Sequence, residues 1–321
     1  MNSAYLGYLI AFLSMFIGTA SLFPFTRAAR EWGSVATNHY RILTALIVLT
    51  PLCMLIDKTS LTALFTSPAL VQFGLLSSSG IIGLVIGDYF AFHSMAILGA
   101  KNSSIFNTLA PGAALFFGYV VLGETINLLG IIGVAISIGG MIWFLKASGD
   151  AEDKALNVPE YGSLSKGVIF GILSGLAQGF HITLSKKALM MEPHVSPFHA
   201  TWIRVFAATI TYFSLTLIQG RLKTNVIDVI RNKKHVIAKA TYASVFGMAL
   251  SVILVMWCVT LCEVSVAQTI LSMGPIVIVP MAYILYKERV SFQTILAAIV
   301  SIGGVVILIY RNQVMTWFGL H

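Results

Sequence analysis

The sequence predicts an all-α membrane protein with ten transmembrane helices arranged as two inverted five-helix repeats. Three observations lead to this fold class. The composition is strongly apolar, ten apolar stretches recur along the chain, and an internal repeat divides the chain into two halves.

The composition places the chain in a lipid bilayer. Hydrophobic residues make up 57% of the sequence, charged residues make up 10%, and the mean hydropathy is +0.88. A soluble domain carries about 25% charged residues. The net charge is +8, and the basic residues lie mostly between the apolar stretches, where such residues set the membrane topology. We therefore expect the lipid bilayer as the surroundings and no nucleic-acid partner.

Ten apolar stretches are long enough to span a bilayer, which takes roughly 20 residues in a helix. The connections between most of these stretches are short. The predicted spans cover residues 5–25, 36–56, 69–92, 103–122, 127–145, 167–185, 198–218, 240–261, 264–286 and 292–310.

The internal repeat is clearest between residues 99–146 and 263–310, which overlay without a gap at an offset of 164. Both segments present a proline, then a glutamate, then a Ser-Ile-Gly-Gly run in the same register. The matching pairs are Pro111 and Pro275, Glu124 and Glu288, and the runs 137–140 and 301–304. A repeat of this kind decides the fold, because it means that two homologous units form one structure.

The repeat extends to the earlier spans, where Arg41 matches Arg204 at an offset of 163. We therefore expect a first five-helix repeat over residues 1–147, a polar connecting loop over 148–165, and a second five-helix repeat over 166–321. Five is an odd number, so the second repeat enters the membrane from the opposite side. The two halves are then inverted repeats, related by a pseudo-two-fold axis in the membrane plane.

Two segments carry a family resemblance. The segment from Pro111 to Leu122-Gly123-Glu124 and the segment from Pro275 to Tyr286-Lys287-Glu288 resemble the drug/metabolite transporter superfamily, specifically its EamA-type ten-span members. The resemblance implies a secondary transporter in the cell (inner) membrane that works by alternating access. It implies a small polar metabolite as substrate, such as an amino acid or a related compound, with export as the direction. We expect a monomer, with a proton as a candidate coupling ion.

The sidedness of the termini has two opposing indications. Fourteen of the 20 Lys and Arg residues lie in loops after odd-numbered spans, and four lie in even loops and the tail. The positive-inside rule then places both termini outside the cell. The family resemblance implies both termini in the cytoplasm, so both assignments stay open.

The sixth span has a polar stripe, in which four residues at intervals of 4, 3 and 4 share one helical face. These residues are Ser174, Gln178, His181 and Ser185. A ridge of small residues runs beside the stripe and would let another helix approach closely: Gly167, Gly171, Gly175 and Gly179. We interpret the stripe as the lining of a water-filled cavity. The alternative is hydrogen bonding between helices, and Ser14 gives the first span only a weaker version of the stripe.

Asp88 is the only carboxylate well inside a predicted span. An ionisable group there costs about 2.5–3.5 kcal/mol, so it should face the interior. Phe92 shares its face, whereas His93 lies about 140° around the helix; both are further cavity candidates. The functional interpretation is a proton-coupling or cation-binding carboxylate. The alternative is a buried acid that is protonated or bonded to a hydroxyl such as that of Tyr89.

The two repeat-related prolines are expected to break their helices, because proline removes a backbone hydrogen bond. The polar residues on the same faces, or beside them, are Ser104, Asn107, Thr108, Gln268 and Ser272. A substrate site near the midplane of a repeat-built transporter would use such faces. Trp257 and Phe92 are candidate walls, with packing against lipid or core as the alternative.

Topology allows two arginine–glutamate pairs among the repeat-related charges. Arg41 and Glu288 fall on one side of the membrane, and Arg204 and Glu124 fall on the other. We predict that the two pairs are alternating gates. In the alternative, each arginine reaches toward the lipid headgroups and each glutamate caps its loop.

Several kinds of site are missing from the sequence, which has no zinc-protease, phosphate-loop or nucleophile-elbow motif. We therefore expect no catalytic residue, no cofactor and no metal site, and we assign Cys53, Cys258 and Cys262 to packing. The rival functions are a multidrug or cation efflux protein that uses Asp88 as its cation site, and an intramembrane enzyme or lipid flippase.

Overall fold

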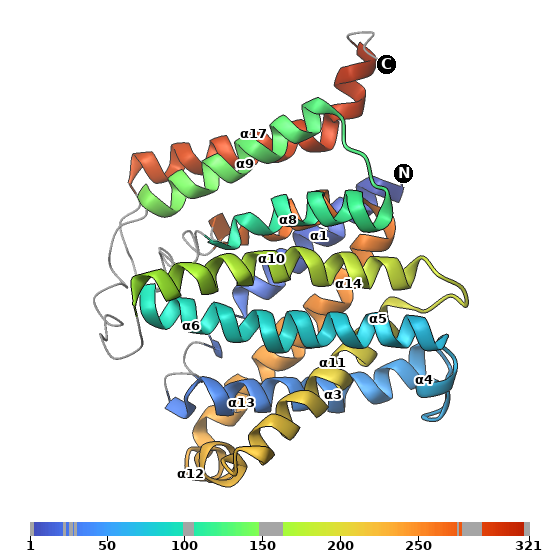
Figure 1. The fold of residues 1–321 in the computed structure, drawn as a ribbon, viewed down its shortest axis with the longest axis vertical. Helices are drawn as coiled ribbons and strands as arrows, with labels where there is room; N and C mark the ends of the chain where they lie inside the picture. The colour runs from blue at the N-terminus through green and yellow to red at the C-terminus, as the bar shows by residue number, and fades with distance from the viewer. Residues whose placement is uncertain are drawn as a thin grey trace. The chain divides into compact units, whose positions relative to one another are not determined.

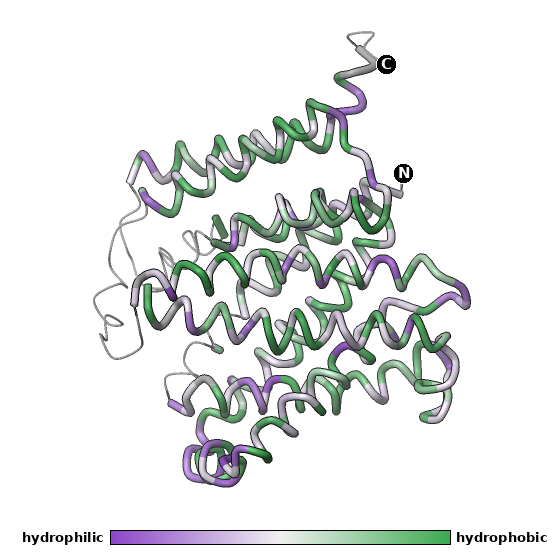
Figure 2. The backbone as a smooth tube through the Cα atoms, viewed as in Figure 1, coloured by the Kyte–Doolittle hydropathy of each residue, from purple (hydrophilic) through white to green (hydrophobic). Residues whose placement is uncertain are grey.

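The computed structural model describes residues 3–21, 24–25, 28, 31–98, 106–147, 163–274, 276–277 and 291–317. The described residues are almost entirely helical and contain no strand, which confirms the predicted all-α fold (Figure 1). Figure 2 shows apolar residues along most of the helices and hydrophilic residues gathered in the turns around α12. By contacts the chain divides into two compact units, Met1–Val85 with Leu184–Leu261, and Ile86–Thr183 with Cys262–His321. They are called unit 1 and unit 2.

Among the described residues, eight helices are long and apolar enough to cross a membrane. They are Ser3–Ala20, Val35–Ile56, Leu70–Ser94, Leu128–Ala147, Ser165–Leu189, Pro197–Ile218, Lys234–Leu261 and Phe292–Val314. The predicted span 103–122 corresponds to a shorter apolar helix, Leu109–Leu122. Of the predicted span 264–286, Pro275 and residues 278–286 lie outside the described residues. Eight of the ten predicted spans are thus confirmed.

Unit 1 contains helices from both repeats. They are α1 (Ser3–Ala20), α3 (Ser34–Ile56), α4 (Ala63–Thr66), α5 (Leu70–Gly80), α11 (Pro197–Ile218), η5 (Lys223–Ile227), α12 (Asp228–Asn232), η6 (Lys234–Val236), α13 (Ile237–Ala243), η7 (Ser244–Leu250) and α14 (Ser251–Leu261). Within the unit α1 packs on α14, and α11 packs on both α3 and α5. Since α3 and α11 are the second span of their respective repeats, two repeat-related helices are direct neighbours.

Polar side chains tie the helices of unit 1 together at one end. Ser196 caps α11 by accepting a hydrogen bond from the backbone N–H of His199 at 3.0 Å, and Pro197 begins the helix. The buried amide of Gln72 donates to the carbonyls of Met191 and Pro193 at 2.9 and 2.8 Å. Together these bonds hold the connection that precedes α11.

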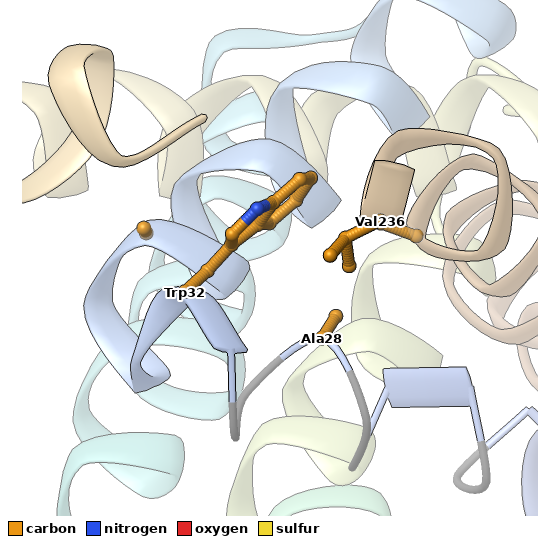
Figure 3. Packing of buried hydrophobic residues seen from close by; sticks show 5 residues of the cluster. Ala28, Trp32 and Val236 are labelled. Atoms are coloured by element: carbon orange, nitrogen blue, oxygen red, sulfur yellow. The ribbon is translucent and has the colours of Figure 1, made fainter. Parts of the chain in front are cut away.

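A small apolar cluster joins the start of α3 to α13 and the short helix before it. Figure 3 shows Trp32, Ala28 and Val236 in this cluster, which also includes Ala36 and Ala240. The indole Nε1 of Trp32 donates to the carbonyl of Lys233 at 3.1 Å. This hydrogen bond holds the end of the connection between α11 and α13 against the residues just before α3.

Unit 2 also draws on both repeats. It contains α6 (Asp88–Leu98), α8 (Leu109–Phe117), η2 (Gly118–Leu122), α9 (Leu128–Ala147), α10 (Leu164–Leu189), α15 (Val264–Leu271) and α17 (Phe292–Trp317). Two helices cross the division: α10 continues into unit 1 after Thr183, and the π-helical segment η1 (Ile81–Gly87) contains the boundary at Val85. Within unit 2, α9 packs on α17 and α8 packs on α15. Both are pairs of repeat-related helices.

The repeated Ser-Ile-Gly-Gly run is the crossing point of α9 and α17. The hydroxyl of Ser301 donates to the carbonyl of Ser137 at 3.0 Å. A Cβ at Gly140 would lie 2.6 Å from the backbone nitrogen of Ser301, and one at Gly304 would lie 2.4 Å from that of Ser137. The glycines are therefore required by the close approach of two backbones, which is how small residues pack membrane helices.

Candidate functional site

Most of the predicted cavity residues belong to unit 2. Those that the structure describes there are Asp88, Phe92, His93, Asn107, Thr108, Ser174, Gln178, His181, Gln268 and Ser272. Unit 1 holds Ser14 and Trp257, and Ser104 lies outside the described residues. The candidate site is therefore a feature of unit 2, and its residues come from α6, α8, α10 and α15.

The residues of the polar stripe on α10 have different surroundings along the helix. Gln178 and His181 bond each other, with 2.9 Å between Oε1 and Nε2, and His181 is buried. Ser174 is also buried, and its hydroxyl oxygen makes no hydrogen bond in the structure. Ser185 lies in unit 1, where its hydroxyl is 2.5 Å from that of Ser79. The Ser185 end of the stripe thus joins helices, which is the alternative that the sequence left open.

The glycine ridge of α10 is packed along its whole length, as predicted. A Cβ added at Gly167 would lie 2.7 Å from the side chain of Leu98, and one at Gly171 would lie 2.4 Å from the ring of Phe106. A Cβ at Gly175 would lie 2.5 Å from the carbonyl oxygen of Phe106, just before α8, and one at Gly179 would lie 2.6 Å from the side chain of Ala113 in α8. The ridge brings α10 into direct contact with the segment 106–114 and fixes the direction of the polar stripe beside it.

Asp88 begins α6 and is partly buried, and the residues that follow it in α6 contribute to a cluster of aromatic rings. The rings of Tyr89 and His93 have centroids 4.0 Å apart, and Phe90 stacks on Phe170 of α10 at 5.6 Å. His93 also bonds the carbonyl of Tyr89 through Nδ1 at 2.8 Å. The side chain of Phe92 is 37% exposed. Aromatic faces attract cations, and α6 carries both aromatic rings and a carboxylate.

The repeat-related helices α8 and α15 both break at the same repeat position. Thr108, just before α8, has φ −70° and ψ −11°, and Ser272, just after α15, has φ −71° and ψ −10°. Thr108 lies three residues before the buried Pro111, which has no backbone N–H and therefore weakens the helix in the turn before it. Pro275, at the matching position, lies outside the described residues. The backbone conformation nevertheless obeys the repeat at both positions.

Polar side chains accompany these two breaks. Thr108 and Gln268 are buried, while Asn107 is exposed. The hydroxyl of Ser272 donates to the carbonyl of Thr269 at 2.8 Å. Since α8 packs on α15 and α10 packs on the segment 106–114, unit 2 gathers amide, hydroxyl and imidazole groups from three helices. Such groups can orient a small polar molecule by hydrogen bonds.

The two cavity candidates of unit 1 have other surroundings. Ser14 and Ser251 exchange hydrogen bonds between α1 and α14, each hydroxyl donating to the other residue's carbonyl at 2.9 and 3.1 Å. Ser14 therefore joins two helices, as the packing alternative predicted for such hydroxyls. Trp257 lies on α14 and is 42% exposed.

The predicted gating residues are held by neighbours inside their own units. The carboxylate of Glu124 accepts the backbone N–H of Val264 at 2.9 Å and so caps the start of α15. Arg204 is buried, and its Nη1 donates to the sulfur of Met256 at 3.1 Å. The guanidinium carbon of Arg41 lies 5.7 Å from the ring centroid of Phe25. Glu288 lies outside the described residues, and the gates stay a prediction.

One ion pair of unit 2 was missed by the sequence analysis. Arg311 of α17 bonds Glu263 at 2.5 Å and the carbonyl of Leu308 at 2.8 Å, with only 3% of Arg311 exposed. A lone arginine near the end of the last span gave no local signal of its partner, which lies 48 residues earlier. The pair anchors α17 at the start of α15, beside the cap made by Glu124.

Comparisons with known proteins agree with this architecture. A model of the EamA-like transporter family matches the chain twice, over residues 5–146 and 165–310. None of the curated proteins matches the sequence. A solved structure whose title reads "Crystal structure of protein" has a TM-score of 0.68 and 14% identity, and the match covers 94% of this chain and 96% of that one. That likeness supports the fold alone.

Proposed function

The chain belongs to the EamA-like transporter family, and on this premise we propose that it is a secondary transporter that moves a small polar metabolite by alternating access. The proposed direction is export, across a cell (inner) membrane. The membrane location itself follows from the family and from the eight apolar helices. The proposal goes beyond the family in naming the substrate class, the direction and the residues.

The observation that carries the proposal is the pair of helix breaks at Thr108 and Ser272. A broken helix exposes backbone carbonyls and amides, and irregular backbone inside a membrane is tolerated where it lines a cavity or is covered by protein. Transporters built from inverted repeats place their substrate sites at such discontinuous helices. The two breaks occupy matching repeat positions, and the same unit holds the hydrogen-bonded pair of Gln178, which is half-buried, and His181, which is buried.

The substrate class follows from the side chains of unit 2. The buried candidates are mainly an amide, an imidazole and hydroxyls, which donate and accept hydrogen bonds without a fixed charge. Groups of this kind match the amino, hydroxyl or carbonyl groups of a small metabolite such as an amino acid. We propose that Gln178 and His181 contact the substrate directly, and that Asp88 is the site of a coupling proton.

A second candidate function has its own supporting observation. Asp88 directly precedes Tyr89 and Phe90 in α6, whose rings form an aromatic cluster with His93 and Phe170. Aromatic faces and a carboxylate attract organic cations, so this arrangement favours a multidrug or cation efflux protein as the alternative.

Counterflow in proteoliposomes tests the proposal. Purified protein is reconstituted, preloaded with an amino acid mixture or with a quaternary ammonium compound, and exchange of labelled solute is measured. Exchange of an amino acid or similar metabolite supports the first function, whereas exchange of only the cation supports the alternative. Chemical conversion of the solute would overturn both and indicate an enzyme.

The role of Gln178 is tested by labelling in the same system. A cysteine at Gln178 should react with a water-soluble maleimide, and the transported solute should slow the reaction. A cysteine at Gly171 should label poorly, because that position is packed against Phe106. Fast labelling at Gly171 with none at Gln178 would show that the polar stripe does not face the transport path.

A further inference from the structure

The connection between α11 and α13 lies at the membrane edge. It runs from residue 219, just after the apolar span Pro197–Ile218, to residue 236. Its last three residues also begin the next apolar span, Lys234–Leu261. A short connection between two spans must lie where the hydrocarbon core ends and the lipid headgroups begin. This connection folds into the short helices η5, α12 and η6.

A groove of about 380 Å³ separates this connection from α3 and α11. Most of its lining is aliphatic or aromatic, and includes Leu43, Phe213, Leu222, Val226, Ile230 and Ile237. The two uncharged polar side chains in the wall, those of His39 and Tyr40, are already bonded to protein. His39 bonds Thr216 at 2.9 Å, and Tyr40 bonds Thr241 at 2.6 Å. The groove therefore presents an apolar surface to whatever fills it.

Basic side chains surround this apolar groove. The stretch from residue 221 to residue 239 contains one acidic residue, Asp228, and six Lys or Arg residues: Arg221, Lys223, Arg231, Lys233, Lys234 and Lys239. Arg231 and Lys234 line the groove itself and are exposed. Figure 2 shows this concentration of hydrophilic residues around α12. An apolar slot with two cations at its rim is complementary to an amphiphile with a negatively charged head.

The wall of the groove is held in place before any ligand binds. Glu31 bonds His235 through its carboxylate and Lys233 through its carbonyl. Trp32 and Val236, which directly follow Glu31 and His235 in the sequence, belong to the apolar cluster shown in Figure 3. A preformed site loses less conformational entropy on binding than a mobile one.

We propose that this groove binds one anionic phospholipid of the surrounding bilayer. An acyl chain lies along Leu43, Phe213 and Ile230, and the phosphate group contacts Arg231 and Lys234. The bilayer supplies this ligand at the depth where the groove lies. Basic clusters at the cytoplasmic ends of spans recognise anionic headgroups in the same way. All the residues that line the groove belong to unit 1.

Thermal stability of the purified protein with added lipid tests the proposal. Phosphatidylglycerol should raise the melting temperature of the wild type more than phosphatidylcholine does, because a ligand stabilises the folded state that it binds. The double variant Arg231→Gln/Lys234→Gln should need roughly 30-fold more phosphatidylglycerol for half the effect, at about fivefold per lost charge. The charge-conserving variant Arg231→Lys/Lys234→Arg should respond like the wild type.

Two controls separate this groove from general effects. Lys166→Gln/Lys187→Gln removes the same charge from two exposed positions of α10 and should leave the lipid response unchanged. Leu43→Trp fills the groove without altering its charges and should weaken the response. The proposal is overturned if phosphatidylcholine is equally effective, if the charge variant matches the wild type, or if Leu43→Trp has no effect. A full response to glycerol phosphate alone would also overturn it, because the site would then bind free phosphate.

Discussion

At the scale of single residues, the Gly-Glu turn after η2 shows how a repeated pattern acquires a structural role. Gly123 has φ +69°, a left-handed conformation that favours glycine, and it ends the helix. The next residue, Glu124, is thereby directed to the start of α15, where its carboxylate caps Val264. A carboxylate at a helix start also interacts favourably with the helix dipole.

Removing this cap should destabilise unit 2. We expect Glu124→Ala to lower the free energy of unfolding by about 0.5–2 kcal/mol, because an N–H at the start of α15 loses its partner. Glu124→Gln keeps an acceptor oxygen and should cost less. Melting temperatures in detergent measure both effects, with the exposed Glu192→Ala as the matched control. Equal melting temperatures for Glu124→Ala and Glu192→Ala would contradict the capping role.

Asp88 supports a second prediction at this scale. If its carboxylate carries the coupling proton, Asp88→Asn should abolish solute accumulation driven by a pH gradient while solute exchange continues. The amide keeps the size of the side chain but cannot gain and lose a proton. Both activities can be measured in the same proteoliposomes. Gradient-driven accumulation that survives in the variant would remove Asp88 from the coupling mechanism.

At the scale of elements, the two repeat-related pairs of helices in unit 2 share a local feature, which is a run of small residues in one pair and a break in the other. The helices α9 and α17 cross at their Ser-Ile-Gly-Gly runs, where backbone meets backbone. The helices α8 and α15 pack on each other, and each has its break at the repeat position of Thr108. The repeat is therefore visible as contacts between equivalent helices and not only as a sequence pattern.

Neighbouring glycines of α9 offer a matched test of the crossing. Gly140→Ala places a methyl group 2.6 Å from the backbone of Ser301, so we expect a loss of about 1–3 kcal/mol from overpacking. Gly139 has nothing within 4 Å of an added Cβ, and Gly139→Ala should be neutral or stabilising by about 0.5–1 kcal/mol. Melting temperatures of the two variants in detergent decide the matter. A Gly139→Ala variant less stable than Gly140→Ala would mean that the helix faces are assigned wrongly.

At the scale of the whole molecule, the two repeats do not form separate bodies. Unit 1 takes α1, α3 and α5 from the first repeat and α11 and α14 from the second. Unit 2 takes α8 and α9 from the first repeat and α15 and α17 from the second. Each unit is therefore stabilised by contacts between helices of the two repeats.

The inversion of the repeats predicts the sidedness of two equivalent positions. Ser60 follows α3 and Lys223 follows α11, and the two are related by the offset of 163. In a variant without the three native cysteines, we expect Ser60→Cys and Lys223→Cys to label with an impermeant maleimide from opposite sides of the membrane. The result would also decide between the charge count and the family resemblance for the termini. Labelling of both positions from the same side would exclude an inverted repeat.

The sequence by itself determined the helical class, eight of the spans and the two repeats, because hydropathy and periodicity are properties of the chain read in order. It also located the glycine ridge of α10, since a four-residue spacing places side chains on one face. Only the tertiary structure decided which polar residues join helices. Ser14 forms a hydrogen bond with Ser251, 237 residues later in the sequence, and Ser185 forms one with Ser79, 106 residues earlier. The partner of a hydrogen bond or an ion pair depends on which helices become neighbours in space, and no local pattern records that choice, as the pair of Arg311 and Glu263 shows.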